Sequence, residues 1–276
     1  MKNFTKRTVT GIIYVILLLA GTMIHPLVFG VVFAIMLFFV QLEFYKLVEN
    51  SGYYCPHKRV GLILGVSLFA VCFGVVYKLL PIAFSLLFIP FLTLIFLFEI
   101  LRVDSQVLKN ATITLAGFIY IAVPISLLNF IVFSGFPGTP VFYPSTLVGI
   151  FFVVWAYDSA AYLIGSKWGR NKIHEKISPN KTWEGFIAGA VFGLIMGIIN
   201  AVLFQRLTVA SWLAVASVIV LFGTLGDLFA SKIKRELNVK DSGTIMPGHG
   251  GLLDRVDSLL FAIPFIFIWL IISGNI

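Results

Sequence analysis

The chain has 276 residues, of which 59% are hydrophobic and 12% charged, and its formal net charge is +8. A soluble domain ordinarily carries about 25% charged and roughly 45–50% apolar residues, so this composition excludes an ordinary soluble protein and indicates an integral membrane protein. It also argues against a nucleic-acid partner, because no soluble basic region exists to bind one. The positive charge suits anionic membrane lipids instead.

Long apolar runs predict nine transmembrane helices, because a span needs about 20 mostly apolar residues, with a range of roughly 17–25. The predicted fold class is therefore all-α, a polytopic integral membrane protein. No small-residue cleavage pattern follows the first run, which we interpret as an uncleaved helix. The expected helices are 9–25, 27–47, 60–77, 80–100, 112–133, 146–166, 183–204, 211–231 and 253–272.

The basic residues indicate how this arrangement is oriented. With nine helices, all but Lys78 and Arg206 of the 20 Lys and Arg residues fall on one side of the membrane. Cytoplasmic loops are enriched in Lys and Arg, so we expect a cytoplasmic N-terminus, a C-terminus outside, and a multi-pass protein of the inner (cytoplasmic) membrane. We divide the chain into an N-terminal transmembrane region, 1–145, with helices 1–5, and a C-terminal catalytic region, 146–276, with helices 6–9 and cytoplasmic loops.

Acidic residues lie toward the cytoplasmic ends of these helices. A carboxylate within a span costs about 2.5–3.5 kcal/mol at mid-bilayer on insertion scales, so such groups usually face a cavity, a partner or a metal. We expect several of them to converge on one polar chamber open to the cytoplasm. They are Glu43, Glu99, Asp158, Glu184, Asp227, Asp254 and Asp257.

Glycine recurs at every fourth position of the seventh expected helix. Such a stripe allows another helix to approach closely, either within the chain or across a homodimer. We assign it a role in packing and no chemistry. The glycines are Gly185, Gly189, Gly193 and Gly197.

The segment from Asp227 to the ninth helix carries the clearest chemical pattern. Asp227 and Ser231 are four residues apart and share a helix face, which Lys234 continues with Arg235 beside it. The glycine-rich connection 240–251 favours a concave turn whose backbone N–H groups bind anionic oxygens. Basic side chains around this turn suit phosphate groups. The candidate binding residues are Lys234, Arg235, Lys240, His249, Gly250, Gly251 and Arg255, with Asp241 as a further candidate.

Three carboxylates in this segment predict a metal site. Asp254 and Asp257 are three residues apart and point the same way, and Asp227 joins them from the preceding helix. An all-oxygen site of this kind suits Mg²⁺. The alternative, a favourable interaction with the helix N-terminus worth about 0.3–1 kcal/mol, explains one acidic residue but not three from two helices. Metal, cations and a glycine-rich turn are typical of phosphoryl or nucleotidyl transfer. For His249, a plain hydrogen-bonding role in the loop stays open.

A second polar stretch follows the sixth expected helix, which contains Asp158. Its basic loop continues through Ser178-Pro179, where we expect a turn, to Lys181, which offers another phosphate-directed ammonium. Both loops emerge on the same side and can close on one ligand. The chain contains no Gly-Lys, which excludes a P-loop nucleotide site.

The C-terminal polar segment reads Ser231-x-Ile233-Lys234-Arg235, then Lys240-Asp241, then Pro247-x-His249-Gly250-Gly251-x-x-Asp254-Arg255-x-Asp257. This pattern resembles the signature of the phosphatidate cytidylyltransferases, also called CDP-diacylglycerol synthases. The segments 158–162 and 177–185 are similar to that family as well, so the resemblance covers about residues 150–258, whereas residues 1–145 match it only in being apolar and multi-spanning.

The resemblance implies the reaction of CTP with phosphatidic acid to give CDP-diacylglycerol and pyrophosphate. It implies Mg²⁺ dependence, with K⁺ as a candidate second cation, an all-helical fold and a homodimer. Asp227, Asp254 and Asp257 would bind the metal, the basic residues would bind the phosphates, and Ser231 would hydrogen-bond nearby. Rival interpretations are a CTP-dependent polyprenol or phytol kinase, an archaeal-type lipid cytidylyltransferase and a transporter. A transporter is disfavoured because the polar groups lie toward one face, with no internal repeat.

Overall fold

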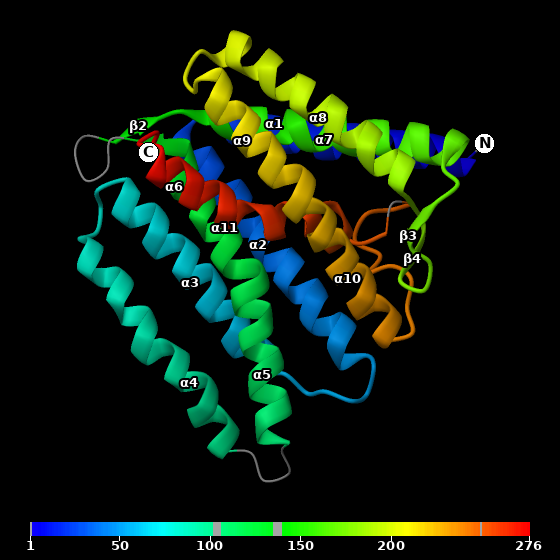
Figure 1. The fold of residues 1–276 in the computed structure, drawn as a ribbon. Coiled ribbons are helices and arrows are strands. Elements are labelled where there is room, and N and C mark those ends of the chain that lie inside the picture. Colours follow the sequence, from blue (N-terminus) through cyan, green and yellow to red (C-terminus); the bar gives the residue numbers. More distant parts are fainter. Residues whose placement is uncertain (1, 102–105, 135–139, 249) are drawn as a thin grey trace.

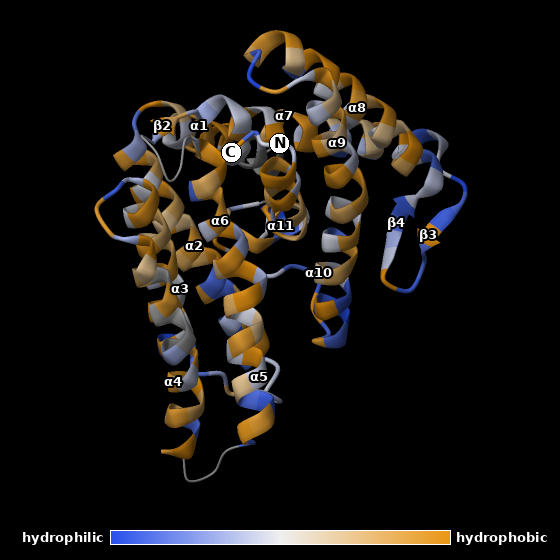
Figure 2. Cartoon of the chain, turned by 60° about the vertical axis from the view of Figure 1, so that its left-hand side comes forward, coloured by the Kyte–Doolittle hydropathy of each residue, from blue (hydrophilic) through white to orange (hydrophobic). Residues whose placement is uncertain are grey.

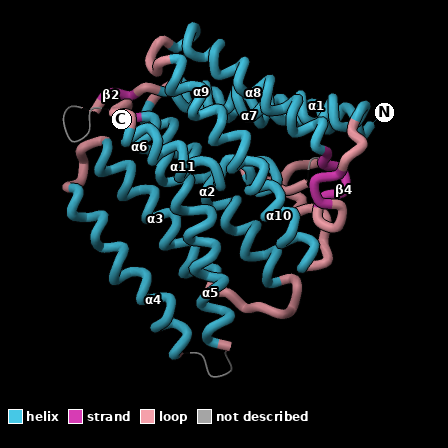
Figure 3. Tube along the Cα trace, viewed as in Figure 1, coloured by secondary structure: helices cyan, strands magenta, loops and turns pink. Residues whose placement is uncertain are grey.

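A computed structural model describes residues 2–101, 106–134, 140–248 and 250–276 of the chain. Helices dominate the fold, and Figure 3 shows that strands are confined to small hairpins. When helices that continue without a break are taken together, the described residues form nine helical segments, which confirms the expected number. The two hairpins are a difference from the all-α expectation.

The N-terminal region contributes five of these segments (Figure 1). A single π-helical turn, η2, joins α5 to α6 without interrupting the helix, and the 3-10 helix η1 leads directly into α4. His25 caps α2, because its Nδ1 accepts the N–H of Leu27 at 3.1 Å. The elements are α1 (Lys2–Met23), α2 (Pro26–Glu49), α3 (Lys58–Val76), η1 (Ile82–Leu87), α4 (Phe88–Ile100), α5 (Val107–Gly117), η2 (Phe118–Ala122) and α6 (Val123–Val132).

The C-terminal region contributes the remaining four segments. Thr182 caps α8 and Thr208 caps α9, each accepting a backbone N–H three residues later. A second π-helical turn, η3, joins α9 to α10. The elements are β1 (Phe133–Ser134), β2 (Val141–Phe142), α7 (Pro144–Trp168), β3 (Lys172–His174), β4 (Ser178–Thr182), α8 (Trp183–Phe204), α9 (Val209–Val218), η3 (Ile219–Gly223), α10 (Thr224–Glu236), η4 (Leu253–Arg255) and α11 (Asp257–Ile272).

Three expectations about this region need correction. The eighth segment continues to Glu236 rather than ending at 231, because its last residues are charged and extend beyond the apolar run. The ninth begins at Asp257 rather than 253, since Leu253–Arg255 form a separate 3-10 turn. The expected turn at Ser178-Pro179 is instead the beginning of β4, which pairs antiparallel with β3.

Six helices in the described part of the chain are long and apolar enough to cross a membrane. Two shorter apolar helices, Thr8–Met23 and Asp257–Ile272, accompany them. The protein is therefore a polytopic, predominantly helical membrane protein, while nine spans and their orientation stay predictions. The six are Pro26–Glu49, Lys58–Val76, Val107–Val132, Pro144–Trp168, Trp183–Phe204 and Val209–Glu236.

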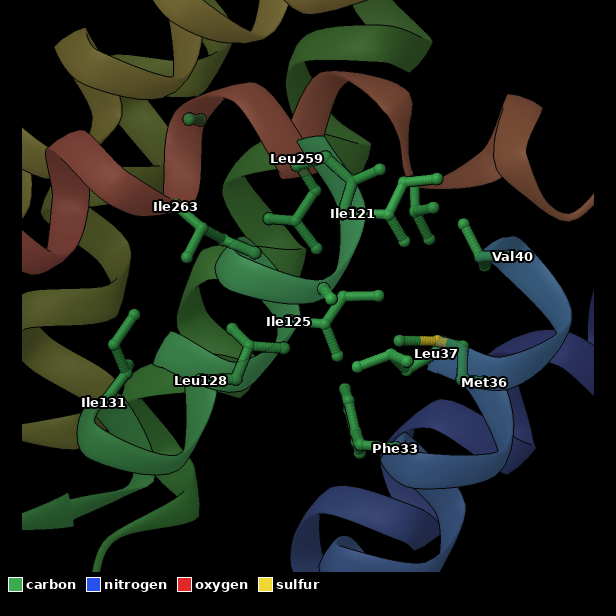
Figure 4. Packing of buried hydrophobic residues seen from close by; sticks show 14 of the residues in the cluster. Phe33, Met36, Leu37, Val40, Ile121, Ile125, Leu128, Ile131, Leu259 and Ile263 are labelled. Carbon is green, nitrogen blue, oxygen red and sulfur yellow. The ribbon is translucent and has the colours of Figure 1, made fainter. Parts of the chain in front are cut away.

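Both regions share one hydrophobic core. Figure 4 shows Phe33 and Leu37 of α2 beside Ile125 of α6, with Leu259 and Ile263 of α11 in the same cluster. All five are buried. Since lipid is as apolar as these side chains, close packing rather than escape from water stabilises such contacts within a membrane.

The glycine stripe of α8 packs within the chain, against α7 and α9. A Cβ added at Gly189 would lie 2.8 Å from the ring of Tyr157, and one at Gly197 would lie 3.1 Å from the carbonyl oxygen of Trp212. Of the two roles left open by the sequence, the structure gives these glycines the intrachain one. The opposite face of α8 is apolar and exposed, as the hydrophobic colour along this helix in Figure 2 illustrates.

Side-chain contacts define two ends of the helix bundle. At one end the guanidinium of Arg206 lies 3.9 Å from the ring centre of Tyr143 and donates to the carbonyl oxygen of Asn275. At the other end, Thr10 of α1 donates to the carbonyl oxygen of Pro247 at 3.2 Å. Hydrophilic residues gather at this second end, on β3–β4 and at the end of α10 (Figure 2).

Candidate active site

A polar cavity of about 490 Å³ opens at the second end of the bundle. Helices α1, α7 and α10 form its walls together with the loop 237–256 and the start of α11. Five carboxylates and two basic side chains line it. The lining residues are Gly11, Tyr14, Val15, Val154, Trp155, Asp158, Asp227, Lys234, Asp241, Met246, Asp254, Arg255, Asp257 and Ser258.

Asp227 lies on the face of α10 that the sequence predicts. Its Oδ1 accepts the hydroxyl of Ser231 at 3.3 Å, as expected for residues four apart in a helix. Its Oδ2 forms an ion pair with the ammonium of Lys181, which β4 carries. Both predicted polar stretches therefore meet at Asp227.

Lys234 connects α10 to the loop 237–256. Its Nζ lies 2.6 Å from Oδ1 of Asp254, and both side chains are nearly buried. Burial raises the pKa of the Asp254 carboxyl, but hydrogen bonds from Lys234 and two backbone N–H groups outweigh this effect. The pKa of Asp254 therefore lies below its ordinary value, and the group is ionised near neutral pH.

The glycine-rich loop folds around the carboxylate of Asp254. The backbone N–H groups of Ser242 and Gly251 donate to its Oδ2 at 2.9 and 3.2 Å. A tight turn closes with the N–H of Met246 donating to the carbonyl oxygen of Gly250, where a φ of +83° requires glycine. The predicted concave turn thus exists, but its N–H groups bind a carboxylate of the same chain.

Glu43 contacts the same loop from α2. Its side chain is buried, and its Oε2 accepts the N–H of Leu253 at 2.9 Å. This carboxylate therefore lies behind the loop rather than on the wall of the cavity. Glu99 does not join the chamber at all, because it pairs with His57 at 3.1 Å.

Asp257 and Asp158 extend the acidic wall. Asp257 is 5% exposed and begins α11, where its Oδ1 accepts the N–H of Ser258 at 2.7 Å. Asp158 reaches the wall from α7. Together with Asp227 they present carboxylates from three helices to one cavity, as the sequence predicts for part of the acidic set.

A second cavity of about 270 Å³ lies on the other side of Asp158 and Asp227, which line both spaces. Its walls come from α7, the β3–β4 hairpin and α8. Lys181 and Asn180 of β4 line it, and Tyr157 joins the wall with its hydroxyl 2.6 Å from that of Thr224. The site is therefore a pair of cavities that share two carboxylates.

Glu184 fixes the position of the β3–β4 hairpin. Its carboxylate accepts the backbone N–H groups of Arg170 and Asn171 at 3.1 and 3.2 Å, and the side-chain amide of Asn171 at 2.8 Å. The hairpin is thereby tied to the first turn of α8. This contact supports the placement of Lys181 beside Asp227.

Several predicted binding residues do not line either cavity. Arg235 donates instead to the carbonyl oxygens of Ile177 and Val239, and Lys240 is exposed. Gly250 and Gly251 shape the loop around Asp254, while His249 lies outside the described residues.

Sequence reasoning missed the contribution of α1 and of part of α7. Gly11, Tyr14 and Val15 line the main cavity beside Trp155. These residues lie in apolar runs like those of the other helices. In α1, only the hydroxyl of Tyr14 and the small residue Gly11 on the same face could have indicated a cavity.

The carboxylates suit a divalent metal by their chemistry, because Mg²⁺ prefers hard oxygen ligands. Among the residues with described positions, however, no three His, Cys, Asp or Glu side chains are arranged to hold a metal ion. Lysines neutralise two of the three predicted ligands, Asp227 and Asp254. The metal role of Asp227, Asp254 and Asp257 stays a prediction.

Fold and site together define a polytopic membrane protein with a charged, carboxylate-rich cavity at one end of its helix bundle. The chain belongs to the cytidylyltransferase family, whose family model matches residues 5–273.

Three relatives illustrate the similarity. The phosphatidate cytidylyltransferase of Bacillus subtilis (strain 168) is 46% identical over 116 residues, 42% of this chain and 43% of that protein. That of Staphylococcus saprophyticus is 47% identical over 123 residues, 44% of this chain and 47% of the relative. That of Staphylococcus aureus (strain COL) is 47% identical over 125 residues, 45% and 48% of the two chains. The chain thus matches just under half the length of each of these relatives.

Proposed function

We propose that this protein transfers the cytidylyl group of CTP to phosphatidic acid, giving CDP-diacylglycerol and pyrophosphate for phospholipid biosynthesis. Family membership and the names of the relatives support this activity. The observation that carries it is the main cavity, in which Lys234 and Arg255 lie among acidic side chains at the ends of apolar helices. Such a site accepts a nucleotide and a lipid phosphate together.

The reaction is a displacement at phosphorus. An oxygen of the lipid phosphate forms a bond to the α-phosphorus of CTP, and the bond from that phosphorus to the bridging oxygen of the β-phosphate breaks. Pyrophosphate leaves with the electron pair. The attacking phosphate is already anionic, so no general base is required, and catalysis depends on positioning and charge neutralisation.

Lysine and arginine side chains supply that neutralisation in our proposal. Lys234 and Arg255 line the main cavity and Lys181 the second, so all three lie where phosphate oxygens would enter. Ser231 supports Asp227 through their hydrogen bond. Arg235 and Lys240 lie outside both cavities, and we assign them attraction of anionic substrates toward the membrane surface.

We also propose Mg²⁺ as the cofactor, with Asp227, Asp254 and Asp257 as its ligands. When bound, the ion would neutralise charge on the transferred group. Lys181 and Lys234, which now pair with two of these carboxylates, would then be available for phosphate oxygens. A K⁺ ion sharing the site is part of the same proposal, and activity in KCl against NaCl tests it.

We further propose a homodimer in the inner membrane, with a cytoplasmic N-terminus and the C-terminus outside. The exposed apolar face of α8, which includes Ile187, Val191 and Ile195, faces lipid or a second copy. Cysteine labelling in intact cells tests the orientation: a cysteine at Lys240 should be protected from an impermeant reagent, and one at Asn275 should react. Native mass determination in detergent tests the dimer.

The decisive assay uses CTP labelled at the α-phosphorus, phosphatidic acid and Mg²⁺ with the purified full chain. Label in an extractable lipid, with release of pyrophosphate, supports cytidylyl transfer. Label found only in CDP would identify a kinase, because a kinase transfers the γ-phosphoryl group. Label in lipid with an archaeal-type ether-linked acceptor but not with phosphatidic acid would change the substrate assignment.

A further inference from the structure

Glu43 is a buried carboxylate that the proposed reaction does not use. It lies on α2, 3% exposed, and its Oε2 accepts the N–H of Leu253, 210 residues later in the chain, at 2.9 Å. Leu253 begins the turn that carries Asp254 and Arg255. Burying a carboxylate in a membrane helix is costly, so its contact with this turn calls for a specific role.

Two carboxylates bind this loop from opposite sides. Asp254 accepts the N–H groups of Ser242 and Gly251 from within the loop. Glu43 accepts the N–H of Leu253 from behind it. The position of the turn that precedes α11 therefore depends on a residue outside the C-terminal region.

Glycine allows Glu43 to approach this closely. A Cβ added at Gly243 would collide with the side chain of Glu43. The three nearest atoms that it would meet are the Oε1 atom of Glu43, its Cδ atom at 2.8 Å and its Cγ atom at 3.0 Å. At Gly251 an added Cβ would collide with both Glu43 and Ser242. Glu43 and the two glycines thus form one packed unit.

We propose that Glu43 is a positioning residue for the active site. It fixes the turn Leu253–Arg255, so that Asp254, Arg255 and the start of α11 present their charged groups to the main cavity. Glu43 itself does not line that cavity and touches no substrate. This inference rests on the proposed function for its kinetic consequence, but its structural part can be tested without activity.

A set of four variants tests the proposal in the full chain. Glu43→Ala removes the acceptor for Leu253, whereas Glu43→Gln keeps the shape and one acceptor oxygen. Gly243→Ala displaces the Glu43 carboxylate. The double variant Glu43→Ala/Gly243→Ala has room for the added methyl group. Glu99→Ala is the matched control, because Glu99 is also buried in a helix but contacts His57 instead of the loop.

Hydrogen–deuterium exchange over residues 241–256 gives the activity-independent readout. The exchange rate of the Leu253 amide should be higher than in wild type in Glu43→Ala and Gly243→Ala. It should be close to the wild-type rate in Glu43→Gln and equal to it in Glu99→Ala. In kinetics, Glu43→Ala should lower kcat by about 100-fold with little change in KM, since misplacing catalytic groups by about 1 Å costs that much. Glu43→Gln should recover most of that loss.

The double variant supplies the sharpest outcome. Its kcat should be no lower than that of Glu43→Ala, because the methyl group collides only where Glu43 is present. The proposal would be overturned if the losses in kcat of Glu43→Ala and Gly243→Ala multiplied in the double variant. It would also be overturned if the Leu253 amide of Glu43→Ala exchanged at the wild-type rate. If wild-type protein transfers no label from CTP to phosphatidic acid, the proposed function fails, and the exchange data still decide the role of Glu43.

Discussion

The ammonium of Lys234 lies 2.6 Å from the carboxylate of Asp254, and each side chain is only 12–13% exposed. Lys234 lies in the last turn of α10 and Asp254 in the 3-10 turn η4, so their ion pair joins two parts of the cavity wall. Removing one member of a buried pair leaves the other charge uncompensated, which costs about 3–5 kcal/mol. This pair therefore links the stability of the site to its charge.

Lys234→Met should lower both activity and stability. We expect a loss of about 3 kcal/mol in the free energy of unfolding, because Asp254 keeps its burial without its counter-ion. Unfolding in mixed detergent micelles measures this, and kcat/KM should fall in parallel. Lys232→Met removes an exposed lysine of the same helix and is the control. Equal stabilities for the two variants would contradict the importance of the pair.

The ion pair also predicts how stability depends on pH. The pKa of Asp254 is lower in the folded protein than the ordinary value of about 3.9 for an unfolded chain. The ionised carboxylate of Asp254 therefore contributes fully to the free energy of unfolding above that value, and this contribution is lost as the pH falls through the lower pKa of the folded state. The stability difference between wild type and Asp254→Asn should stay constant from pH 7 to pH 5 and shrink below about pH 4. If the stability difference already shrinks near pH 6, the pKa of Asp254 is not lowered in the folded protein.

Asp257→Asn should abolish turnover while the protein still inserts and folds, because the change removes a charge but keeps the shape of the side chain. Asp227→Asn should behave alike, since both line the main cavity. Initial rates across a Mg²⁺ titration are the measurement. Glu49→Gln, which breaks a half-exposed pair with Lys58 away from the cavity, should leave the rates unchanged. Near-normal kcat for Asp257→Asn at limiting Mg²⁺ would refute the metal role.

Lys181→Ala should weaken substrate use. This lysine pairs with Asp227 and lines the second cavity, so its removal takes away a positive charge that would face the phosphates of a bound substrate. We expect kcat/KM to fall by about 10–100-fold, and Lys181→Arg to recover part of it, since arginine also binds phosphate. Lys176→Ala changes an exposed lysine of the same hairpin and should have little effect.

Gly189→Ala should destabilise the α7–α8 contact. The added methyl group would lie 2.8 Å from the ring of Tyr157 and 3.0 Å from its carbonyl oxygen, so the two helices must move apart. At Gly193 the nearest atom is 3.5 Å away, and Gly193→Ala gains about 1 kcal/mol of helix propensity without a clash. Thermal unfolding should therefore show opposite shifts for these two neighbouring substitutions. Equal shifts would mean that the stripe does not mediate this contact.

Helices and their local contacts were predictable because both depend on nearby residues. The apolar run predicted the observed bounds of α8, Trp183–Phe204. The helix ends where that run ends, because Thr182 caps its start and Gln205, with a φ of +50°, follows its last residue. The contact between Asp227 and Ser231 follows from helical periodicity alone. The charged end of α10 was not predictable from hydropathy, because charged residues continue a helix equally well outside an apolar layer.

Contacts between distant segments were out of reach. The pairs Glu43–Leu253 and Thr10–Pro247 join the first helices to the last loop, and no spacing in the sequence connects them. The spacing of Asp254 and Asp257 predicted that both face one cavity, as they do, but it did not predict that the glycine-rich loop folds around the carboxylate of Asp254. Composition shows which groups are charged, whereas only the fold shows which group neutralises them.

The distance along the chain between Glu43 and Leu253 has a consequence for biosynthesis. A ribosome delivers α2 to the membrane long before residue 253 is made, so the carboxylate of Glu43 must wait for its partner while the intervening helices insert. Until then the carboxylate of Glu43 lacks the N–H group of Leu253, its hydrogen-bond donor in the finished fold. The turn Leu253–Arg255 therefore joins α2 only after all the intervening helices have been made, so this contact between distant segments forms late.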